Sequence, residues 1–174
     1  MSINDFKSNF LGGARPNRFR VQLTFPGAVG SPNVRDEFIV TAAALPSSIL
    51  GVIPVPYQGR QIPVFGDRTF EDWTITLNND TTFSHRNVFE RWMNLINSHE
   101  GNVQGVSDYR NLVSTLDVVQ LDRDDRIIKA YKLYNAWPNN VSQIDLGYDQ
   151  NDTLELFTVT FSYSHWGSPT SVTN

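Results

Sequence analysis

The stretch IPVPYQGRQIPVFGDR, residues 53–68, constrains the fold more than any other part of the chain. Its two apolar arms flank a Tyr-Gln-Gly turn, which is the pattern of a β-hairpin. Proline occurs in both arms, and because proline has no N–H to donate, such a hairpin cannot lie in the middle of a sheet. Its side chains are nevertheless too apolar to face water. The hairpin, taken as residues 50–65, therefore needs a surface to pack against.

Alternating apolar and polar residues predict several other strands and one helix. An amphipathic helix is expected over residues 85–98, with Ser84 as its N-cap. The segment 135–152 reads mostly as loop. Strands are expected over residues 18–25, 38–44, 70–78, 116–121, 127–134 and 154–165, with a polar turn at 122–125. This pattern predicts a mainly β protein, an antiparallel β-sandwich or barrel with one flanking α-helix and an extended β-hairpin arm.

The 174 residues fit one domain that carries two arms. The N-terminal arm covers about residues 1–14, where Phe6 and Phe10 lie in polar sequence and Gly12-Gly13 forms a flexible joint. The hairpin arm covers about residues 46–68. Its last residues, Gly-Asp-Arg-Thr, predict a turn that aims the hairpin, with a hinge or an interface anchor as the alternative.

Composition excludes several classes of function. The chain has no cysteine, which rules out disulfides, thiolate zinc sites and cysteine nucleophiles. Its formal net charge of −4 argues against tight binding of nucleic acid. No apolar run approaches the roughly 20 residues that span a bilayer.

The search for a catalytic or metal site finds no workable set of residues. The three histidines, His85, His99 and His165, do not share a metal-binding spacing. The aspartates of residues 122–125 and 145–152 lack the pattern of a calcium loop and are interpreted as solvated turns. We therefore expect no enzyme activity, no cofactor and no metal. One alternative is a monomeric β-sandwich binding module that recognises carbohydrate through Trp137 or Trp166.

Two apolar arms on a chain without an active site indicate an assembly protein. If the partner is another copy joined head to tail, the product is a ring, a filament or both. An unpaired sheet edge could also extend into the sheet of a neighbour and close a larger barrel.

Several short motifs, in consistent order along nearly the whole chain, make this sequence similar to the tail tube proteins of large contractile-tailed phages. The longest is the block Gly-Asp-Arg-Thr-Phe-x-Asp-Trp-Thr at residues 66–74. The others are Ala-Arg-Pro-Asn-x-Phe at 14–19, Ala-Leu-Pro at 44–46, Ile-Pro-Val at 53–55, Trp-Pro-x-Asn-Val at 137–141 and Phe-x-Val-Thr at 157–160.

The resemblance implies a non-enzymatic protein of the virion, made in the host cytoplasm, whose hexameric rings stack into a hollow tube. Strands from six subunits would form one barrel, and the genome would leave through it without specific binding. The implied partners are other copies, the tail sheath protein, a baseplate or tube initiator and a tail terminator. The tube of a related secretion or bacteriocin device is the alternative. By position in these motifs and in the hairpin, the candidates for contacts between subunits are Arg15, Pro16, Leu45, Pro46, Ile53, Val55, Tyr57, Ile62, Val64, Phe65, Asp67, Arg68 and Trp137.

A lumen through which DNA passes must not hold phosphates, so a neutral or acidic polar wall suits it. Strand faces without basic residues are therefore the candidates, and a solvent face on the outside of the tube is the alternative. The candidate lumen residues are Asp72, Thr74, Thr76, Thr158, Thr160 and Ser162.

Overall fold

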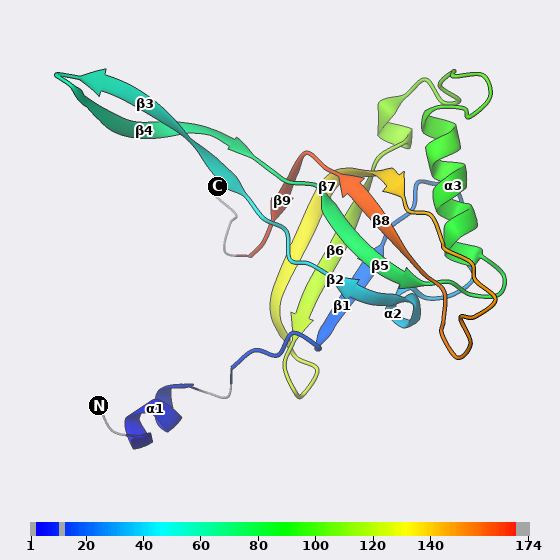
Figure 1. The fold of residues 1–174 in the computed structure, drawn as a ribbon, viewed down its shortest axis with the longest axis horizontal. Helices are drawn as coiled ribbons and strands as arrows, with labels where there is room; N and C mark the ends of the chain where they lie inside the picture. The colour runs from blue at the N-terminus through cyan, green and yellow to red at the C-terminus, as the bar shows by residue number, and fades with distance from the viewer. Residues whose placement is uncertain (1–2, 11–12, 170–174) are drawn as a thin grey trace.

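The computed structural model describes residues 3–10 and 13–169 of the chain. The body is an antiparallel sheet with the strand order β1-β6-β7-β8-β5-β2, in which β9 also pairs with β7 (Figure 1). The hairpin β3-β4 is a separate sheet. The strands are β1 (Phe19–Leu23), β2 (Val40–Ala43), β3 (Ile49–Tyr57), β4 (Arg60–Thr69), β5 (Trp73–Asn78), β6 (Ser114–Leu121), β7 (Ile127–Val141), β8 (Leu156–Ser162) and β9 (His165–Gly167). The helices are α1 (Ile3–Phe10), α2 (Asp36–Ile39), α3 (Ser84–Ile96) and the 3-10 turn η1 (Tyr109–Asn111).

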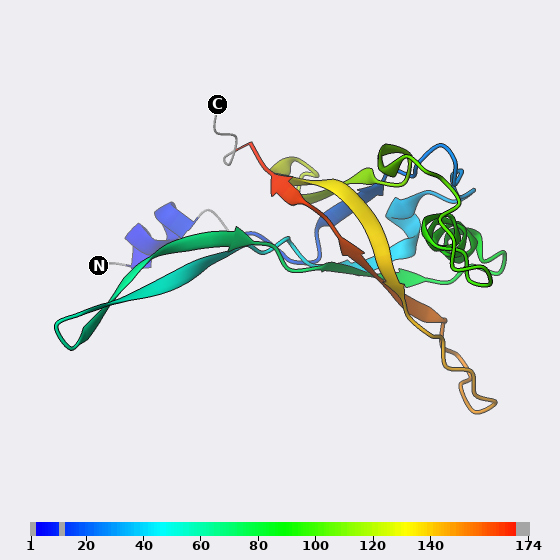
Figure 2. The same cartoon turned by 90° about the horizontal axis from the view of Figure 1, so that it is seen from above.

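The core lies between one face of the sheet and α3, and the mainly β fold with one flanking helix is confirmed (Figures 1 and 2). Phe161 is at its centre, with ring centroids 5.8 Å from Trp73 and Phe89 and 6.4 Å from Trp92. All four side chains are buried. None of the described helices is long and apolar enough to cross a membrane.

Strand β7 corrects the largest error of the sequence interpretation, which assigned residues 135–152 mostly to loop. The strand continues to Val141, beyond its pairing with β6, and pairs with β8 through Trp137–Val141. Asn135 has a positive φ of 54°, and Pro138 interrupts the usual strand composition. Asparagine and proline are both typical of turns, so these two residue types hide the strand from a prediction based on sequence pattern. The predicted strand 154–165 is similarly divided into β8 and β9.

The strand predicted over 38–44 begins later, because residues 36–39 form the short helix α2. The side chain of Asp36 accepts hydrogen bonds from the backbone N–H of Leu23, at 2.8 Å, and contacts Nε2 of buried His85, at 3.0 Å. These contacts hold α2 between β1 and the start of α3. His85 therefore has a structural role that its sequence position did not reveal.

The start of α3 also differs from the prediction. Ser84 is the first helical residue, and the N-cap is Phe83, whose φ of 52° is in the left-handed region. The capping acceptor is the Asp80 side chain, which receives the backbone N–H of Ser84 at 2.9 Å and the hydroxyl of Thr82. Ser84 Oγ instead accepts the backbone N–H of Asn33 at 2.9 Å. Other element ends are shifted, since β5 begins at Trp73 and α3 ends at Ile96.

The carboxyl group of Asp80 is expected to make the fold less stable at acid pH than at neutral pH. Partial burial by itself would raise the pKa of Asp80, but hydrogen bonds from Thr82 and the Ser84 N–H outweigh it and lower the pKa. The charged carboxylate thus stabilises the fold above pH 4, and this contribution is lost as the pH falls through the folded-state pKa. We expect Asp80→Ala to lower the free energy of unfolding by about 1 kcal/mol at pH 7. Urea unfolding should show this deficit shrinking as the pH is lowered toward 2, and an equal deficit at both ends of that range would contradict the account.

Candidate assembly surfaces

The hairpin β3-β4 extends away from the body, and its two strands pair only with each other (Figure 1). Gln58 and Gly59 form its two-residue turn with φ values of 45° and 80°, the left-handed pair that a type I′ turn requires. Tyr57 therefore closes the turn opposite Arg60 as a hydrogen-bonded pair, and pairs alternate from there. Pro54 opposite Pro63 is a non-hydrogen-bonded pair. The prolines cost the hairpin none of its internal bonds, and the prediction of a hairpin outside the main sheet is confirmed.

The turn predicted at residues 66–69 is not found. Asp67, Arg68 and Thr69 continue β4, with Arg68 opposite Leu50. Gly66 is needed for a close approach of two backbones, since a Cβ on it would lie 2.9 Å from the carbonyl carbon of Gly51. A register shift between Leu50 and Val52 accompanies this approach. Neither Asp67 nor Arg68 takes part in the ion pairs found among the described residues.

Two tryptophans hold the segment that leads into the hairpin. Trp73 Nε1 donates to the Ala44 carbonyl at 2.6 Å, and Trp166 Nε1 donates to the Ser47 carbonyl at 2.8 Å. Pro46, between these carbonyls, is buried within its own subunit, whereas Leu45 remains exposed. Pro46 is thus placed for anchoring the hairpin, and a contact with another subunit stays a prediction.

The segment that leaves the hairpin is held by aromatic packing. Phe70 follows β4, and its ring lies 6.0 Å from that of Tyr163 and 6.4 Å from that of Trp166. Tyr131 contacts Trp166 edge to face, with centroids 5.2 Å apart. Burial raises the pKa of Tyr163, with a further contribution from the nearby carboxylates of Asp72 and Glu71. The Tyr163 hydroxyl is therefore neutral at physiological pH.

Trp166 provides a test of this anchorage. We expect Trp166→Phe to lower the free energy of unfolding by about 1 kcal/mol, because an aromatic ring is kept at this position but the donor to Ser47 is lost. Urea unfolding measures this effect. Trp166→Leu removes the aromatic contacts as well and is expected to cost more. An unchanged free energy of unfolding in Trp166→Phe would show that the hydrogen bond to the Ser47 carbonyl contributes nothing, and equal effects of the two substitutions would show that the aromatic contacts contribute nothing.

The N-terminal arm contains the helix α1, whose apolar residues Ile3, Phe6 and Phe10 are all exposed. The rings of Phe6 and Phe10 stack with centroids 5.0 Å apart, so the helix presents one apolar stripe. Gly12, the first residue of the predicted Gly12-Gly13 joint, lies outside the described residues, as does Leu11. Arg15 and Pro16 follow in an exposed segment before β1.

One partly exposed face of the sheet, directed away from the core, unites the two predicted sets of lumen residues. Thr74 lies opposite Thr160, and Thr76 lies opposite Thr158, on the neighbouring strands β5 and β8. The hydroxyls of Thr74 and Thr160 are 3.0 Å apart. We call this surface the threonine face, and it consists of Thr74, Thr76, Thr158, Thr160 and Ser162.

Asn139 belongs to the edge of this face but was missed, because its segment was predicted to be loop. Its side-chain N–H groups donate to Asp72 at 2.7 Å and to Ser162 at 2.9 Å. The Ser162 hydroxyl donates to the other oxygen of Asp72 at 2.7 Å. Asp72, the one charged member of the predicted lumen set, is thus held by hydrogen bonds from two strands.

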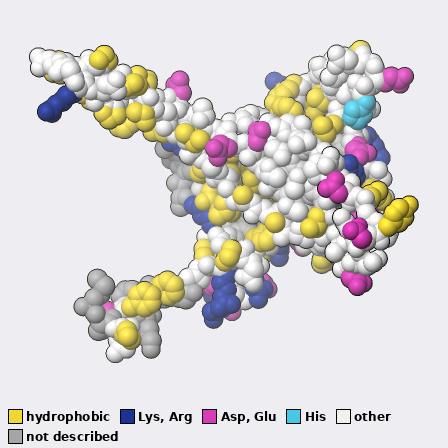
Figure 3. Space-filling view, viewed as in Figure 1, with side chains coloured by type: hydrophobic (Ala, Val, Ile, Leu, Met, Phe, Trp, Pro, Cys, Tyr) yellow, Lys and Arg dark blue, Asp and Glu magenta, His cyan; other side chains and the backbone are white. Residues whose placement is uncertain are grey.

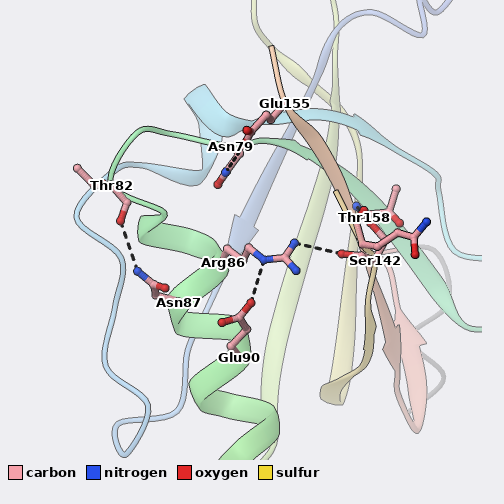
Figure 4. A network of polar contacts seen from close by, with 9 residues as sticks. Asn79, Thr82, Arg86, Asn87, Glu90, Ser142, Glu155 and Thr158 are labelled. Carbon is pink, nitrogen blue, oxygen red and sulfur yellow. Dashed lines mark hydrogen bonds and ion pairs between the residues drawn. The ribbon is translucent and has the colours of Figure 1, made fainter. Parts of the chain in front are cut away.

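The opposite side of the same strands is fixed to α3 through Arg86 (Figure 4). The guanidinium donates to Glu90 at 2.8 Å and to the Ser142 carbonyl at 3.1 Å. It also lies 5.6 Å from the ring centroid of Phe157. Ser142 Oγ in turn accepts the backbone N–H of Thr158 at 2.9 Å. These contacts join the strand that carries Thr158 to the helix.

The tryptophans do not form a ligand platform. Trp166 is committed to Ser47 and to its aromatic neighbours, and half-buried Trp137 packs against the core. Trp137 thus packs against its own core with part of its surface still accessible, and its place at a subunit interface stays a prediction. Among the described residues, no group of acidic or histidine side chains is arranged to hold a metal ion.

The comparisons with known proteins agree on one family. The sequence model described as "Phage tail tube protein" matches residues 14–168. The chain is 32% identical over 169 residues to the tail tube protein gp19 of Enterobacteria phage T4, which covers 95% of this chain and 99% of that protein. It is also 32% identical over 170 residues to the tail tube protein of Serratia phage KSP90, covering 93% of this chain and 94% of that protein.

The fold is also shared with a solved structure, the sheath-tube complex of an extracellular contractile injection system in the extended state. The TM-score is 0.58 at 13% sequence identity, and the match covers 97% of each chain.

Proposed function

This chain belongs to the phage tail tube protein family, and on that premise we propose that it assembles into stacked hexameric rings that form the inner tube of a contractile tail. It is a structural protein of the tail and not an enzyme. The observation that carries the assembly proposal is the exposed apolar surface of both arms. A body with its own closed core has no use for such surface unless another chain covers it.

The threonine face is proposed as the wall of the lumen. It is hydroxyl-rich and without basic side chains, so it offers no cation to the phosphates of passing DNA. The strands β7, β8, β5 and β2 form the part of the sheet that carries this face, and β2 is its free edge. We propose that this edge pairs with a neighbouring subunit and extends the sheet around the ring.

The proposed partners outside the tube are the tail sheath protein, a baseplate or tube initiator and a tail terminator. A sheath-tube complex is the source of one solved structure with this fold, which supports a sheath around the tube. We further propose that the chain is made in the host cytoplasm and incorporated into the virion tail there.

Negative-stain electron microscopy of the purified protein, with sedimentation across a concentration series, tests the proposal. We expect hollow rods or stacked rings, either spontaneously or after an initiator ring is added, because an initiator supplies the first template. A protein that sediments as a monomer at every concentration and does not grow on an initiator would overturn it.

A further inference from the structure

The two end strands of the sheet, β1 and β2, are both in contact with the short helix α2. End strands carry backbone N–H and C=O groups that face away from their own sheet and can pair with another chain. The helix follows the loop after β1 and runs directly into β2 at Val40, so it lies next to both edges (Figure 1). Its conformation therefore affects how much of each edge is open.

Local sequence does not favour a helix at α2. Its four residues make a single turn, and isolated helices of this length are unstable in water. The run from Phe38 to Thr41 consists of aromatic and β-branched residues, which are typical of a strand. The N-cap residue, Arg35, makes no side-chain capping bond within the described part of the chain. Tertiary contacts must therefore hold these residues in helical form.

The contacts that hold α2 converge on Asp36. One carboxylate oxygen accepts the backbone N–H of Leu23 at 2.8 Å, and the other lies 3.0 Å from Nε2 of His85. Because an ionised carboxylate can only accept, Nε2 is the nitrogen that donates. The side chain of Asp36 is 14% exposed and that of His85 is 1% exposed, so water competes little for these bonds. We call the contacts of Asp36 with Leu23 and His85 the Asp36 latch.

The latch covers the edge of β1 and limits the length of β2. Leu23 lies in the end strand β1, and its N–H is bonded to the Asp36 side chain instead of to a further strand. At the other edge, the helical residues 36–39 leave β2 with only four residues, and a register shift lies between Val40 and Ala42. Covered, short and bulged edges are the means by which sheet proteins avoid pairing with other chains.

Such protection has a use in a subunit that exposes apolar surface. Hydrophobic side chains are visible along the hairpin and on α1 in Figure 3. They include Phe65, which is 86% exposed, and Ile3, which is 75% exposed. Two free subunits that meet could bury this surface together, and open sheet edges would let them join in several registers. A covered edge opposes this unguided association.

We propose that the Asp36 latch is an autoinhibitory contact, which suppresses the association of free subunits. While the latch is closed, the edges of β1 and β2 offer few backbone groups for pairing. Release of Asp36 frees the Leu23 N–H and lets the strand-forming residues 38–39 lengthen β2. This inference rests on the proposed tube function, in which the β2 edge pairs with a neighbour, and it adds a contact that controls when this edge is used.

Asp36→Ala opens the latch, and Glu37→Ala is the matched control. Glu37 is the next residue of α2, and its exposed carboxylate pairs with Arg20 at 3.2 Å. Both variants remove one negative charge from the same helix, but only the first removes the partner of Leu23 and His85. Amide hydrogen exchange reports the latch directly. We expect the Leu23 N–H to exchange at least about tenfold faster in Asp36→Ala and at an unchanged rate in Glu37→Ala.

Sedimentation across a concentration series, without an initiator, measures the effect on association. We expect Asp36→Ala to associate at a concentration at least about tenfold lower than that of the unchanged protein, and Glu37→Ala to associate as the unchanged protein does. Asp80→Ala is a second control, because it weakens the start of α3 without removing a contact of the latch. Equal association of Asp36→Ala and Asp80→Ala would mean that lower stability, and not an open edge, is the cause, and the proposal would be wrong.

Circular dichroism establishes beforehand that each variant is folded. If Asp36→Ala is not folded, Asp36→Asn takes its place, because asparagine has the size of aspartate but only one acceptor oxygen for two donors. An association concentration equal to that of the unchanged protein in the folded variant would overturn the autoinhibitory role while the tube function stands. If the unchanged protein forms no tubes even on an initiator, the proposed function itself fails.

Discussion

Removing the hairpin is expected to abolish tube assembly while the body remains folded. In the variant, a Gln-Gly turn replaces residues 50–65, which eliminates the exposed apolar side chains of the hairpin. Each large apolar side chain contributes about 1.5–3 kcal/mol when fully buried, so several of them together far exceed the 1.4 kcal/mol that corresponds to a tenfold change in affinity. We expect the concentration needed for assembly to rise by more than about 100-fold, as measured by sedimentation and electron microscopy.

The body supplies the internal check for this experiment. Its core lies between the sheet and α3 and includes no residue of the hairpin. Circular dichroism and urea unfolding should therefore show a folded protein. Gln58→Asn is the matched control, because asparagine tolerates the positive φ at this turn position and leaves the apolar side chains unchanged. If the deletion variant forms tubes of normal length, the hairpin is not needed for assembly.

Positive charge on the threonine face is expected to block genome ejection without preventing tube formation. The variant combines Thr74→Lys with Thr158→Lys, two positions on adjacent strands that are not directly opposite each other. Every subunit would then place two cations on the proposed lumen wall. DNA releases counterions when lysines neutralise its phosphates, so a lysine-lined tube would hold the genome in a salt-dependent way.

Phage particles that carry this variant should have tails of normal appearance but a strongly reduced infectivity. The matched control replaces the same two threonines by glutamine, which is polar, of similar length and uncharged. Normal infectivity of the glutamine particles would show that charge, and not side-chain size, is responsible. Normal infectivity of the lysine particles would mean that the threonine face is on the outside of the tube.

Local sequence was sufficient for the elements whose side chains alternate regularly. In β1, β5 and β8, apolar residues face the core and polar residues face outward, which is the period of a half-buried strand. The hairpin and its separation from the main sheet followed from the prolines. The regular alternation in β5 and β8 also allowed the individual threonines of the proposed lumen wall to be selected.

Several features had no local signal. Asn135 and Pro138 resemble loop residues, yet they lie in the longest strand because β6 and β8 pair with it. Asp36 folds into α2 because Leu23 and His85 provide its hydrogen-bond partners from distant positions. Asn139 became part of the candidate lumen surface only through Asp72, which is 67 residues away.

By its own pattern, this sequence specifies a β-sheet body with one helix and two apolar arms, because side-chain period and proline chemistry act over a few residues. The pairing of β5 with β8, which joins two separate threonine runs into one face, depends on contacts between residues more than 80 positions apart. The assignment of Pro46 and Trp137 to the subunit's own packing likewise required the folded chain. The type of an apolar residue predicts that it is buried but not what buries it, because the core of its own subunit and the surface of a neighbouring subunit favour the same residue types.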